Sequence, residues 1–180
     1  MARLPYVAPP GDVTSRIRER RGGRLTALDG MLLHSPEFAD GWNSMLGAVR
    51  GTSTLPPDIR ELAILRVAAR NGADYEWVAH EPLARQAGLG DEQIAAIKVG
   101  GAGTAGGAGR LGPSQWAALA YTDAVTMHVS VRREIFAAVR AHFDDRQVLE
   151  LTVTVAAYNM VSRVLVALEV APGDDPFPAR

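Results

Sequence analysis

Two carboxylates and an imidazole have the spacing of a proton-transfer site. Glu76 and His80 lie four residues apart, and Glu61 precedes the histidine by nineteen residues. Residues i and i+4 of a helix project from one face, so the side chains of Glu76 and His80 can touch. The rest of that face is apolar, and an unpaired charge buried there would cost several kcal/mol. Proton transfer is one function that gives such groups partners.

Each of the three residues also has a purely structural interpretation. Glu61 lies near the start of its predicted helix, and Glu76 follows a predicted helix start at Asp74. The helix dipole favours carboxylates at both places. A single histidine is more often a core or surface residue than a catalytic one. The joint spacing, rather than any one residue, therefore favours a site.

The composition excludes several classes of protein. The chain has 180 residues and no cysteine, which rules out disulfides, thiolate nucleophiles, zinc-thiolate sites and cysteine-based peroxidase chemistry. Its formal charge is -1, with basic residues spread along the chain, so we expect neither nucleic acid nor a membrane as a partner. No long apolar stretch lacks a charge and no signal-peptide core is present, which predicts a cytoplasmic protein.

Helical periodicity dominates and strand alternation is nearly missing, which predicts one all-α domain over residues 1–180. The predicted helices cover residues 26–33, 36–49, 57–70, a segment from residue 74, and then 91–98, 113–127, 130–142 and 144–170. Their predicted N-caps include Ser35, Asp74, Asp91 and Ser130. We expect residues 1–24 and 171–180 to be irregular.

Two segments interrupt this helical pattern. Pro82 removes the hydrogen bond to the carbonyl of Val78, so we expect either a kink or a break between two short helices. Residues 100–112 are rich in glycine and contain a G-x-G-x-x-G pattern. A dinucleotide site would need a strand before this pattern and a helix directly after it, and both are missing. The segment is therefore predicted to be a flexible connector.

The last predicted helix is apolar on nearly all sides. Such a helix lies either at the centre of a large core or at a subunit interface. For a chain of this length, the second interpretation is favoured, and we expect a homo-oligomer.

Three stretches of the sequence carry a family resemblance. They are the string Arg60-Glu61-Leu-Ala-Ile-Leu, the segment from Tyr75 to Ala84, and the late Ala156-Ala-Tyr158-Asn159 with Arg163. Together they resemble the carboxymuconolactone decarboxylase family and its alkylhydroperoxidase D-like relatives. The resemblance runs roughly from Leu25 to Val170 and is sharpest from Leu55 to Leu89. It implies an alkylhydroperoxidase D-like helical bundle of about seven to eight helices, assembled as a trimer or a larger ring.

The resemblance also separates two branches of the family. In the peroxidase branch, a glutamate is followed by a C-x-x-C pair and then by a histidine. On this chain the glutamate falls on Glu61 and the histidine on His80, while the two cysteine positions fall on Ala73 and Glu76. Because both redox thiols are absent, the resemblance implies the decarboxylase side of the family, which needs no cofactor.

The implied reaction is a decarboxylation that needs only acid/base groups. A carboxylated butenolide loses carbon dioxide, and the electrons spread into the lactone as a dienolate that is then protonated. The protein must supply a proton donor, a group that holds carboxylates, and an apolar pocket. His80 is the natural acid or base, with Glu61 or Glu76 to orient it. A buried glutamate that keeps its proton is an alternative acid.

A second group of residues is predicted to bind the substrate. Arg163 is the preferred clamp for a carboxylate, because it lies in an otherwise apolar helix. A structural ion pair, with Glu150 or with a glutamate of a neighbouring subunit, is the competing interpretation. Arg66 and Arg85 are weaker candidates for the clamp. The aromatic residues that can line the pocket are Trp42, Trp77 and Tyr158.

Three other functions stay open at this point. The first is another cofactor-free reaction on the same scaffold, such as isomerisation, cyclisation or lactone opening. The second is a metal-dependent enzyme that uses Glu61, Glu76 and His80 as ligands, although the preferred prediction includes no metal. The third is a non-enzymatic interaction role, supported only by the apolar last helix. The expected partners are a small carboxylate or lactone substrate and further copies of the chain.

Overall fold

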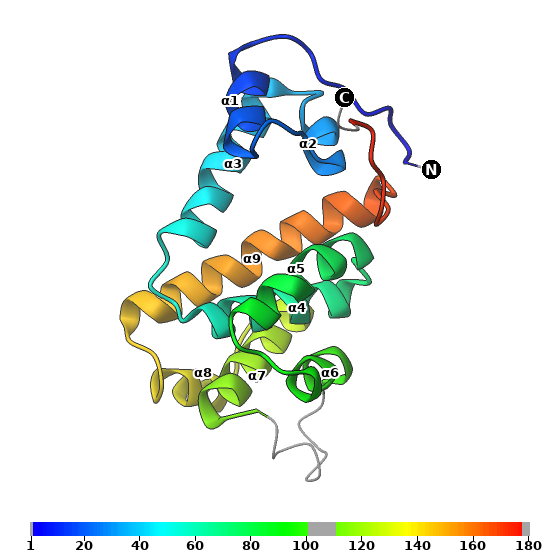
Figure 1. The fold of residues 1–180 in the computed structure, drawn as a ribbon. Coiled ribbons are helices and arrows are strands. Elements are labelled where there is room, and N and C mark those ends of the chain that lie inside the picture. Colours follow the sequence, from blue (N-terminus) through cyan, green and yellow to red (C-terminus); the bar gives the residue numbers. More distant parts are fainter. Residues whose placement is uncertain (1, 101–110, 178–180) are drawn as a thin grey trace. The chain divides into compact units, whose positions relative to one another are not determined.

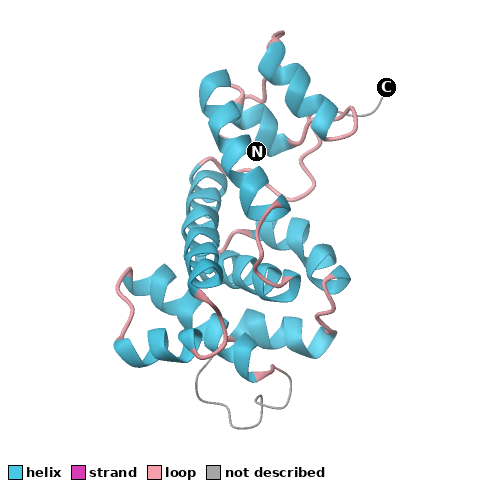
Figure 2. Ribbon diagram, turned by 90° about the vertical axis from the view of Figure 1, so that its left-hand side faces the viewer, coloured by secondary structure: helices cyan, strands magenta, loops and turns pink. Residues whose placement is uncertain are grey.

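The computed structural model describes residues 2–100 and 111–177, and within them every regular element is an α-helix (Figures 1 and 2). The helices are α1 (Asp12–Arg20), α2 (Ala27–Leu32), α3 (Pro36–Gly51), α4 (Pro57–Asn71), α5 (Asp74–Gln86), α6 (Asp91–Val99), α7 (Pro113–His128), α8 (Arg133–Arg140) and α9 (Asp145–Ala167). This arrangement confirms the predicted all-α fold class.

The prediction that residues 1–24 are irregular is wrong, because α1 lies within them. Helix α1 buries only Thr14 and Ile17, and its other residues are mostly charged. One buried turn gives too weak a hydrophobic period to be read from the sequence. At the other end, residues 171–177 contain no helix, as expected. Most of the predicted glycine-rich connector, residues 101–110, lies outside the described residues.

Helix starts were predicted less accurately than helix bodies. Asp74 and Asp91 are the first residues of their helices rather than the N-caps. A carboxylate is stabilised by the helix dipole at either position, so the sequence does not separate the two. The cap predicted at Ser130 is wrong, because α8 begins at Arg133. The backbone turns first at Val129, which has a positive φ of 63°.

The chain divides into two compact units, which are described separately. The first comprises residues Met1–Thr52 and Leu165–Arg180. Here the carboxylate of Asp29 is 1% exposed, accepts hydrogen bonds from Thr26 in a capping box, and pairs with Arg21. Arg3 pairs with Glu169, which joins segments from the two ends of the sequence within this unit.

The second unit, Ser53–Val164, is built around α4. Residues 61–68 of this helix are all buried, and α5, α6 and α7 pack against it. Helix α9 has a buried side that includes Leu151 and Val155, but it also exposes Leu149 and Val153. In the described part of the chain, α9 is the one helix whose length and composition would suit a membrane span, a property shared by core helices.

Arg66 of α4 forms a buried ion pair with Asp123 of α7. Its Nε lies 2.6 Å from Oδ1 and its Nη2 lies 2.8 Å from Oδ2. Its Nη1 donates to the carbonyls of Ile97 and Lys98 at the end of α6. With these three partners, the side chain fastens three helices together. A substrate clamp at Arg66, one of the weaker candidates from the sequence, would have to break this arrangement.

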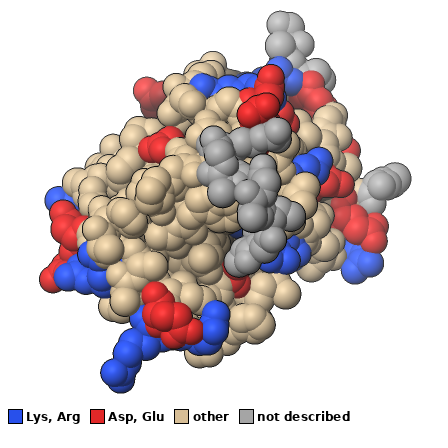
Figure 3. Space-filling view, turned by 90° about the horizontal axis from the view of Figure 1, so that it is seen from below, with Lys and Arg blue, Asp and Glu red and all other residues tan. Residues whose placement is uncertain are grey.

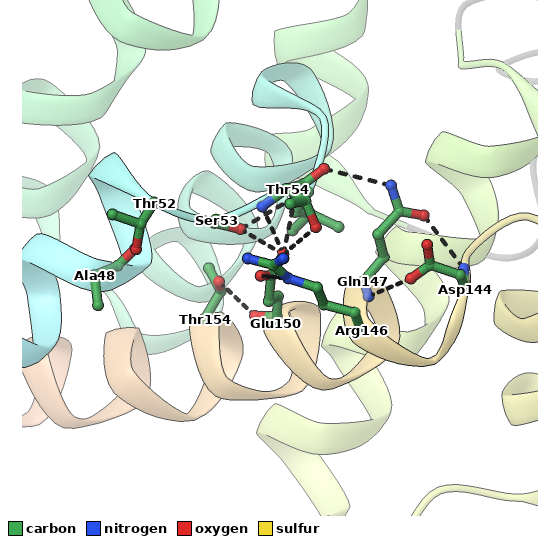
Figure 4. Close-up of polar contacts among 10 residues, drawn as sticks. Ala48, Thr52, Ser53, Thr54, Asp144, Arg146, Gln147, Glu150 and Thr154 are labelled. Atoms are coloured by element: carbon green, nitrogen blue, oxygen red, sulfur yellow. Dashed lines mark hydrogen bonds and ion pairs between the residues drawn. The ribbon is translucent and has the colours of Figure 1, made fainter.

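The carboxylate of Glu150 on α9 holds the loop before α4 in place (Figure 4). Its Oε2 accepts hydrogen bonds from the hydroxyls of Ser53 and Thr54 and from the backbone N–H groups of Thr54 and Leu55, at 2.7 to 3.0 Å. Its Oε1 accepts from Arg146 Nε at 2.9 Å. Desolvation raises the pKa of Glu150, but these hydrogen bonds outweigh it and lower the pKa to about 2.

Pro82 lies inside α5, which continues through it to Gln86. The proline leaves the carbonyl of Val78 without its helical donor. Because the Val78 side chain is 56% exposed, this turn of the helix faces solvent and water can satisfy the carbonyl. The break into two short helices is therefore not observed.

Charged side chains on the face drawn in Figure 3 occur in mixed groups of both signs, separated by uncharged surface. Mixed charge of this kind creates no extended field of one sign, whereas nucleic-acid-binding surfaces depend on such a field. The view agrees with the even spread of basic residues along the sequence.

Candidate active site

The predicted chemical residues meet in the second unit, where three helices each contribute side chains. Helix α4 carries Glu61, α5 carries Glu76 and His80, and α9 carries Tyr158 and Ser162. Figure 1 shows α4 and α5 alongside α9. All five side chains are buried, with residue exposures between 0% and 7%. The cluster is therefore a desolvated site in which every polar group must be partnered or neutral.

His80 is held between Glu61 and Tyr158. Its Nδ1 lies 2.8 Å from Glu61 Oε2, and its Nε2 lies 3.2 Å from the hydroxyl of Tyr158. A carboxylate can only accept hydrogen bonds, so Nδ1 carries a proton and donates it to Glu61. In the neutral imidazole, Nε2 is then the acceptor for the Tyr158 O–H. The two rings meet edge to face at 5.1 Å between centroids, which fixes the imidazole plane.

Glu76 is not hydrogen-bonded to His80, as its i, i+4 spacing would allow, but to a residue of α9. Its Oε2 lies 2.6 Å from Ser162 Oγ, and its Oε1 is buried without a hydrogen-bond partner among the described residues. Desolvation raises the pKa of Glu76 to about 8, although the hydrogen bond with Ser162 lowers it. At neutral pH the folded protein therefore favours the protonated carboxyl group.

The hydroxyl of Ser162 has two acceptors within hydrogen-bonding distance. Its Oγ lies 2.6 Å from Glu76 Oε2 and also 2.8 Å from the backbone carbonyl of Tyr158. When Glu76 is ionised, the Ser162 proton is directed to its carboxylate, and this hydrogen bond opposes the desolvation that raises the pKa of Glu76. When Glu76 is protonated, Ser162 can donate to the Tyr158 carbonyl instead.

The site thus contains two glutamates with different partners. Arg60 Nε lies 3.3 Å from Glu61 Oε1, which places a positive charge beside that carboxyl group. No cationic group among the described residues pairs with Glu76, and burial raises the pKa of this glutamate. Pairs of carboxyl groups whose environments separate them in this way are typical of acid/base enzymes.

The residues predicted to bind substrate are not all close to this cluster. Tyr158 belongs to it. Arg163 is exposed, and its Nη1 donates to the backbone and side-chain oxygens of Asn159. Trp77 donates from Nε1 to Glu81 at 3.0 Å and lies under Lys98, whose Nζ is 4.9 Å from the ring centroid.

The other arginines and aromatic residues considered above have structural partners or lie elsewhere. Arg85 pairs with Glu81 and Asp91 at the surface. The Glu150 that was considered as a partner for Arg163 binds the loop before α4 instead. Trp42 is buried in the first unit.

Two residues of the site were not identified from the sequence, namely Ser162 and Arg60. Ser162 lies four residues after Tyr158, which repeats the spacing of Glu76 and His80 on α5. Two helices with matching i, i+4 pairs can form two parallel contacts. This repeated spacing was the available signal for Ser162. For Arg60, the signal was its position directly before Glu61.

The metal-ligand set considered for Glu61, Glu76 and His80 does not form. In the described ranges 2–100 and 111–177, no three His, Asp or Glu side chains are grouped in a way that could hold a metal ion. Glu61 and His80 are hydrogen-bonded to each other through the atoms that would bind a cation, and Glu76 is directed to Ser162.

Comparison with known proteins gives a family match for part of the chain and identifies the fold. The family model described as "Carboxymuconolactone decarboxylase family" matches residues 36–124, which include Glu61, Glu76 and His80. Tyr158 and Ser162 lie beyond the matched residues. A search of curated proteins found no match to the chain.

Several solved structures share the fold. An uncharacterized peroxidase-related protein from Ralstonia eutropha, with an alkylhydroperoxidase AhpD core, superimposes with a TM-score of 0.80 at 22% identity, over 97% of this chain and 94% of that chain. A peroxidase-related protein from a Silicibacter species gives a TM-score of 0.78 at 20% identity, over 96% and 92% of the two chains. The debrominase Bmp8, solved in complex with 2,3,4-tribromopyrrole, gives 0.76 at 14% identity, over 98% and 96%.

At these identities the structural matches show the fold alone, and the alkylhydroperoxidase D-like bundle predicted from the sequence is confirmed. The family match rests on the sequence. Over residues 36–124, this chain without cysteine is similar to the carboxymuconolactone decarboxylase family.

Proposed function

We propose that this protein is a cofactor-independent acid/base enzyme that decarboxylates a carboxylated lactone or a related unsaturated acid. One observation carries the proposal. A buried histidine is hydrogen-bonded on both ring nitrogens, to Glu61 and Tyr158, in a cluster that also holds the buried carboxyl group of Glu76, whose pKa desolvation raises to about 8. The site therefore contains a proton donor and an oriented imidazole in a water-poor environment.

Decarboxylation requires one bond to break and one proton to be added. The bond between the carboxylate and the ring carbon breaks, carbon dioxide leaves, and the electron pair moves into the unsaturated lactone. The resulting dienolate lacks one proton. Glu76 supplies it, because a carboxyl group with a pKa of about 8 holds a transferable proton at neutral pH. Its carboxylate then regains a proton from water after the product has left.

His80 has a positioning role in this scheme. Glu61 fixes the tautomer in which Nδ1 is protonated, so Nε2 accepts the hydrogen bond of Tyr158 and holds its hydroxyl in the site. By turning its O–H from His80, Tyr158 can donate a hydrogen bond to a developing enolate oxygen without giving up its proton, and the one proton that the dienolate needs comes from Glu76. Burial of the cluster disfavours the substrate carboxylate relative to neutral carbon dioxide.

The peroxidase-related names among the structural neighbours do not carry over to a thiol mechanism here. The chain contains no cysteine, and the residue at one of the two positions where the resemblance implies a thiol is the buried carboxyl of Glu76. Acid/base chemistry is what the groups present can perform. The predicted oligomeric state, partners and cytoplasmic location stay predictions.

The test is release of carbon dioxide from a panel of carboxylated butenolides and related unsaturated acids. We expect turnover by the wild-type protein and at least a ~100-fold loss of kcat in His80→Ala. The matched control is His128→Ala, because His128 is exposed at the end of α7. Wild-type turnover in His80→Ala, with circular dichroism showing an intact fold, would overturn the proposed role of the histidine. Turnover without carbon dioxide release would replace the decarboxylase with another acid/base reaction.

A further inference from the structure

Arg60 has hydrogen-bonding capacity that the described protein does not use. Its side chain is only 16% exposed, yet among the described residues its one polar contact is a 3.3 Å hydrogen bond from Nε to Glu61 Oε1. A guanidinium has five N–H donors in a planar fork. Arg66 on the same helix, which is 1% exposed, uses all three of its nitrogens. The two terminal nitrogens of Arg60 have no equivalent partner in the described chain.

The position of Arg60 connects the buried site with solvent. Arg60 contacts Glu61, and Glu61 contacts His80. Glu61 and His80 are 3% and 7% exposed, whereas the Arg60 side chain keeps 16% of its surface accessible. Of these three linked groups, Arg60 is therefore the one that an incoming ligand can reach most directly.

A carboxylate is the ligand that best fits these unused donors. The two terminal nitrogens of a guanidinium, or one of them with Nε, form parallel hydrogen bonds with the two oxygens of a carboxylate. The partial burial of Arg60 strengthens its attraction for an anion, because water screens the charge less. The positive charge of Arg60 also offsets the repulsion between Glu61 and an incoming carboxylate.

We propose that Arg60, and not Arg163, binds the carboxylate of the substrate. The identity of the reaction rests on the function proposed above, but carboxylate binding by Arg60 does not. Arg163 is the less suitable group because it is exposed and its Nη1 already bonds to Asn159. The competing interpretation is that Arg60 serves only as a counter-ion for Glu61.

The experiment measures binding of two small probes by NMR titration. The probes are 2-furoate, a planar unsaturated ring carboxylate, and 2-furamide, its uncharged analogue. We expect saturable binding of 2-furoate to the wild-type protein, and affinity at least about tenfold lower in Arg60→Gln. Binding of 2-furamide should be the same in both proteins. The control Arg163→Gln should bind both probes like the wild type.

Arg60→Lys keeps the test decisive if Arg60→Gln folds poorly. Lysine preserves the charge beside Glu61 but cannot form two parallel hydrogen bonds. We expect the lysine variant to bind 2-furoate about three- to tenfold more weakly than the wild type and to bind 2-furamide with unchanged affinity. If Arg60 is only a counter-ion, the lysine variant will bind 2-furoate like the wild type. That result would overturn the proposal, as would loss of 2-furoate binding in Arg163→Gln or an absence of 2-furoate binding to the wild type.

The binding measurement and the turnover assay fail in different ways. If Arg60→Gln no longer binds 2-furoate but no carboxylated lactone releases carbon dioxide, carboxylate binding by Arg60 is supported and the decarboxylase activity is contradicted. If Arg60→Gln releases carbon dioxide with an unchanged KM, the decarboxylase activity is supported, but Arg60 does not bind the substrate carboxylate. A raised KM with a largely preserved kcat is the result expected for a residue that binds the substrate carboxylate.

Discussion

Glu76 and Glu150 are two carboxyl groups of the same unit with opposite surroundings. Glu150 is a half-buried residue whose oxygens accept hydrogen bonds from four groups of the loop before α4 and from Arg146. Glu76 is 2% exposed, yet within the described part of the chain it has one hydrogen-bonding side chain, Ser162, and one oxygen without a partner. The more deeply buried carboxyl group therefore has fewer partners.

The difference separates a structural carboxylate from a reactive one. Desolvation acts on both groups, but only Glu150 has enough donors to outweigh it. Its pKa falls to about 2, whereas the pKa of Glu76 rises to about 8. A carboxylate whose oxygens all accept hydrogen bonds from the protein cannot also bind a substrate. A buried carboxyl group with few hydrogen-bond partners keeps a proton that it can transfer. On this basis Glu76 belongs to the chemistry and Glu150 to the fold.

The largest expected effect separates the two glutamates by turnover. Glu76→Gln preserves size but removes the transferable proton, so we expect kcat to fall about 10²- to 10⁴-fold. Glu150→Gln should leave kcat within about threefold of the wild type, because its carboxylate is hydrogen-bonded to the loop before α4 and to Arg146, away from the cluster. Steady-state assays of carbon dioxide release check both. Equal losses in the two variants would remove the distinction between them.

The second effect is a pH dependence of stability with opposite signs for the two groups. The folded protein holds the Glu76 proton up to about pH 8, whereas the ordinary pKa of a glutamate is 4.5. The free energy of unfolding should therefore fall as pH rises between these values, by at most about 1.4 kcal/mol per pH unit. For Glu150, whose pKa drops from 4.5 to about 2, stability is present above pH 4.5 and is lost as pH falls toward 2.

Urea denaturation across this pH range measures both slopes. In Glu76→Gln the decline between pH 4.5 and about 8 should disappear, and in Glu150→Gln the acid loss should become shallower. A Glu76→Gln variant that retains the alkaline decline would show that another group causes it.

The smallest effect comes from Ser162. The hydrogen bond between Ser162 and Glu76 lowers the pKa of Glu76 against desolvation, so Ser162→Ala should raise that pKa further. We expect a loss of about 1 kcal/mol in stability at pH 6, because one buried hydrogen bond is removed. The end of the alkaline decline should shift to higher pH. A shift to lower pH in the same denaturation series would contradict the assigned hydrogen bond.

The sequence predicted the helical fold well where the hydrophobic period was long. Helix α4 follows its predicted range closely, because Pro57 marks its start and Gly72, in a left-handed conformation, marks its end. Helix α1 was missed because it buries a single turn. Residues that mark the start or end of a helix act on their sequence neighbours, so helix boundaries of this kind can be predicted without knowing the fold.

The partners within the site were harder to predict, because they depend on contacts between distant segments. The sequence placed Glu76 and His80 on one helical face, but His80 bonds to Glu61 and Tyr158, while Glu76 bonds to Ser162. The hydrogen-bond partners of Glu76 and His80 depend on how α5 packs against α4 and α9. The spacing of residues within α5 does not determine that packing. The small number of hydrogen-bond partners around Glu76 is likewise a property of the packed structure.

The most direct test of the central claim is the protonation state of Glu76 in the folded protein. Carbon-13 NMR of side-chain carboxyl carbons, with Glu76→Gln used for assignment, follows this group through a pH titration. We predict a midpoint near pH 8 for Glu76, so that the carboxyl group is mostly protonated at pH 7. A midpoint near 4.5, the ordinary value for a glutamate, would contradict the account and leave the site without its proposed acid.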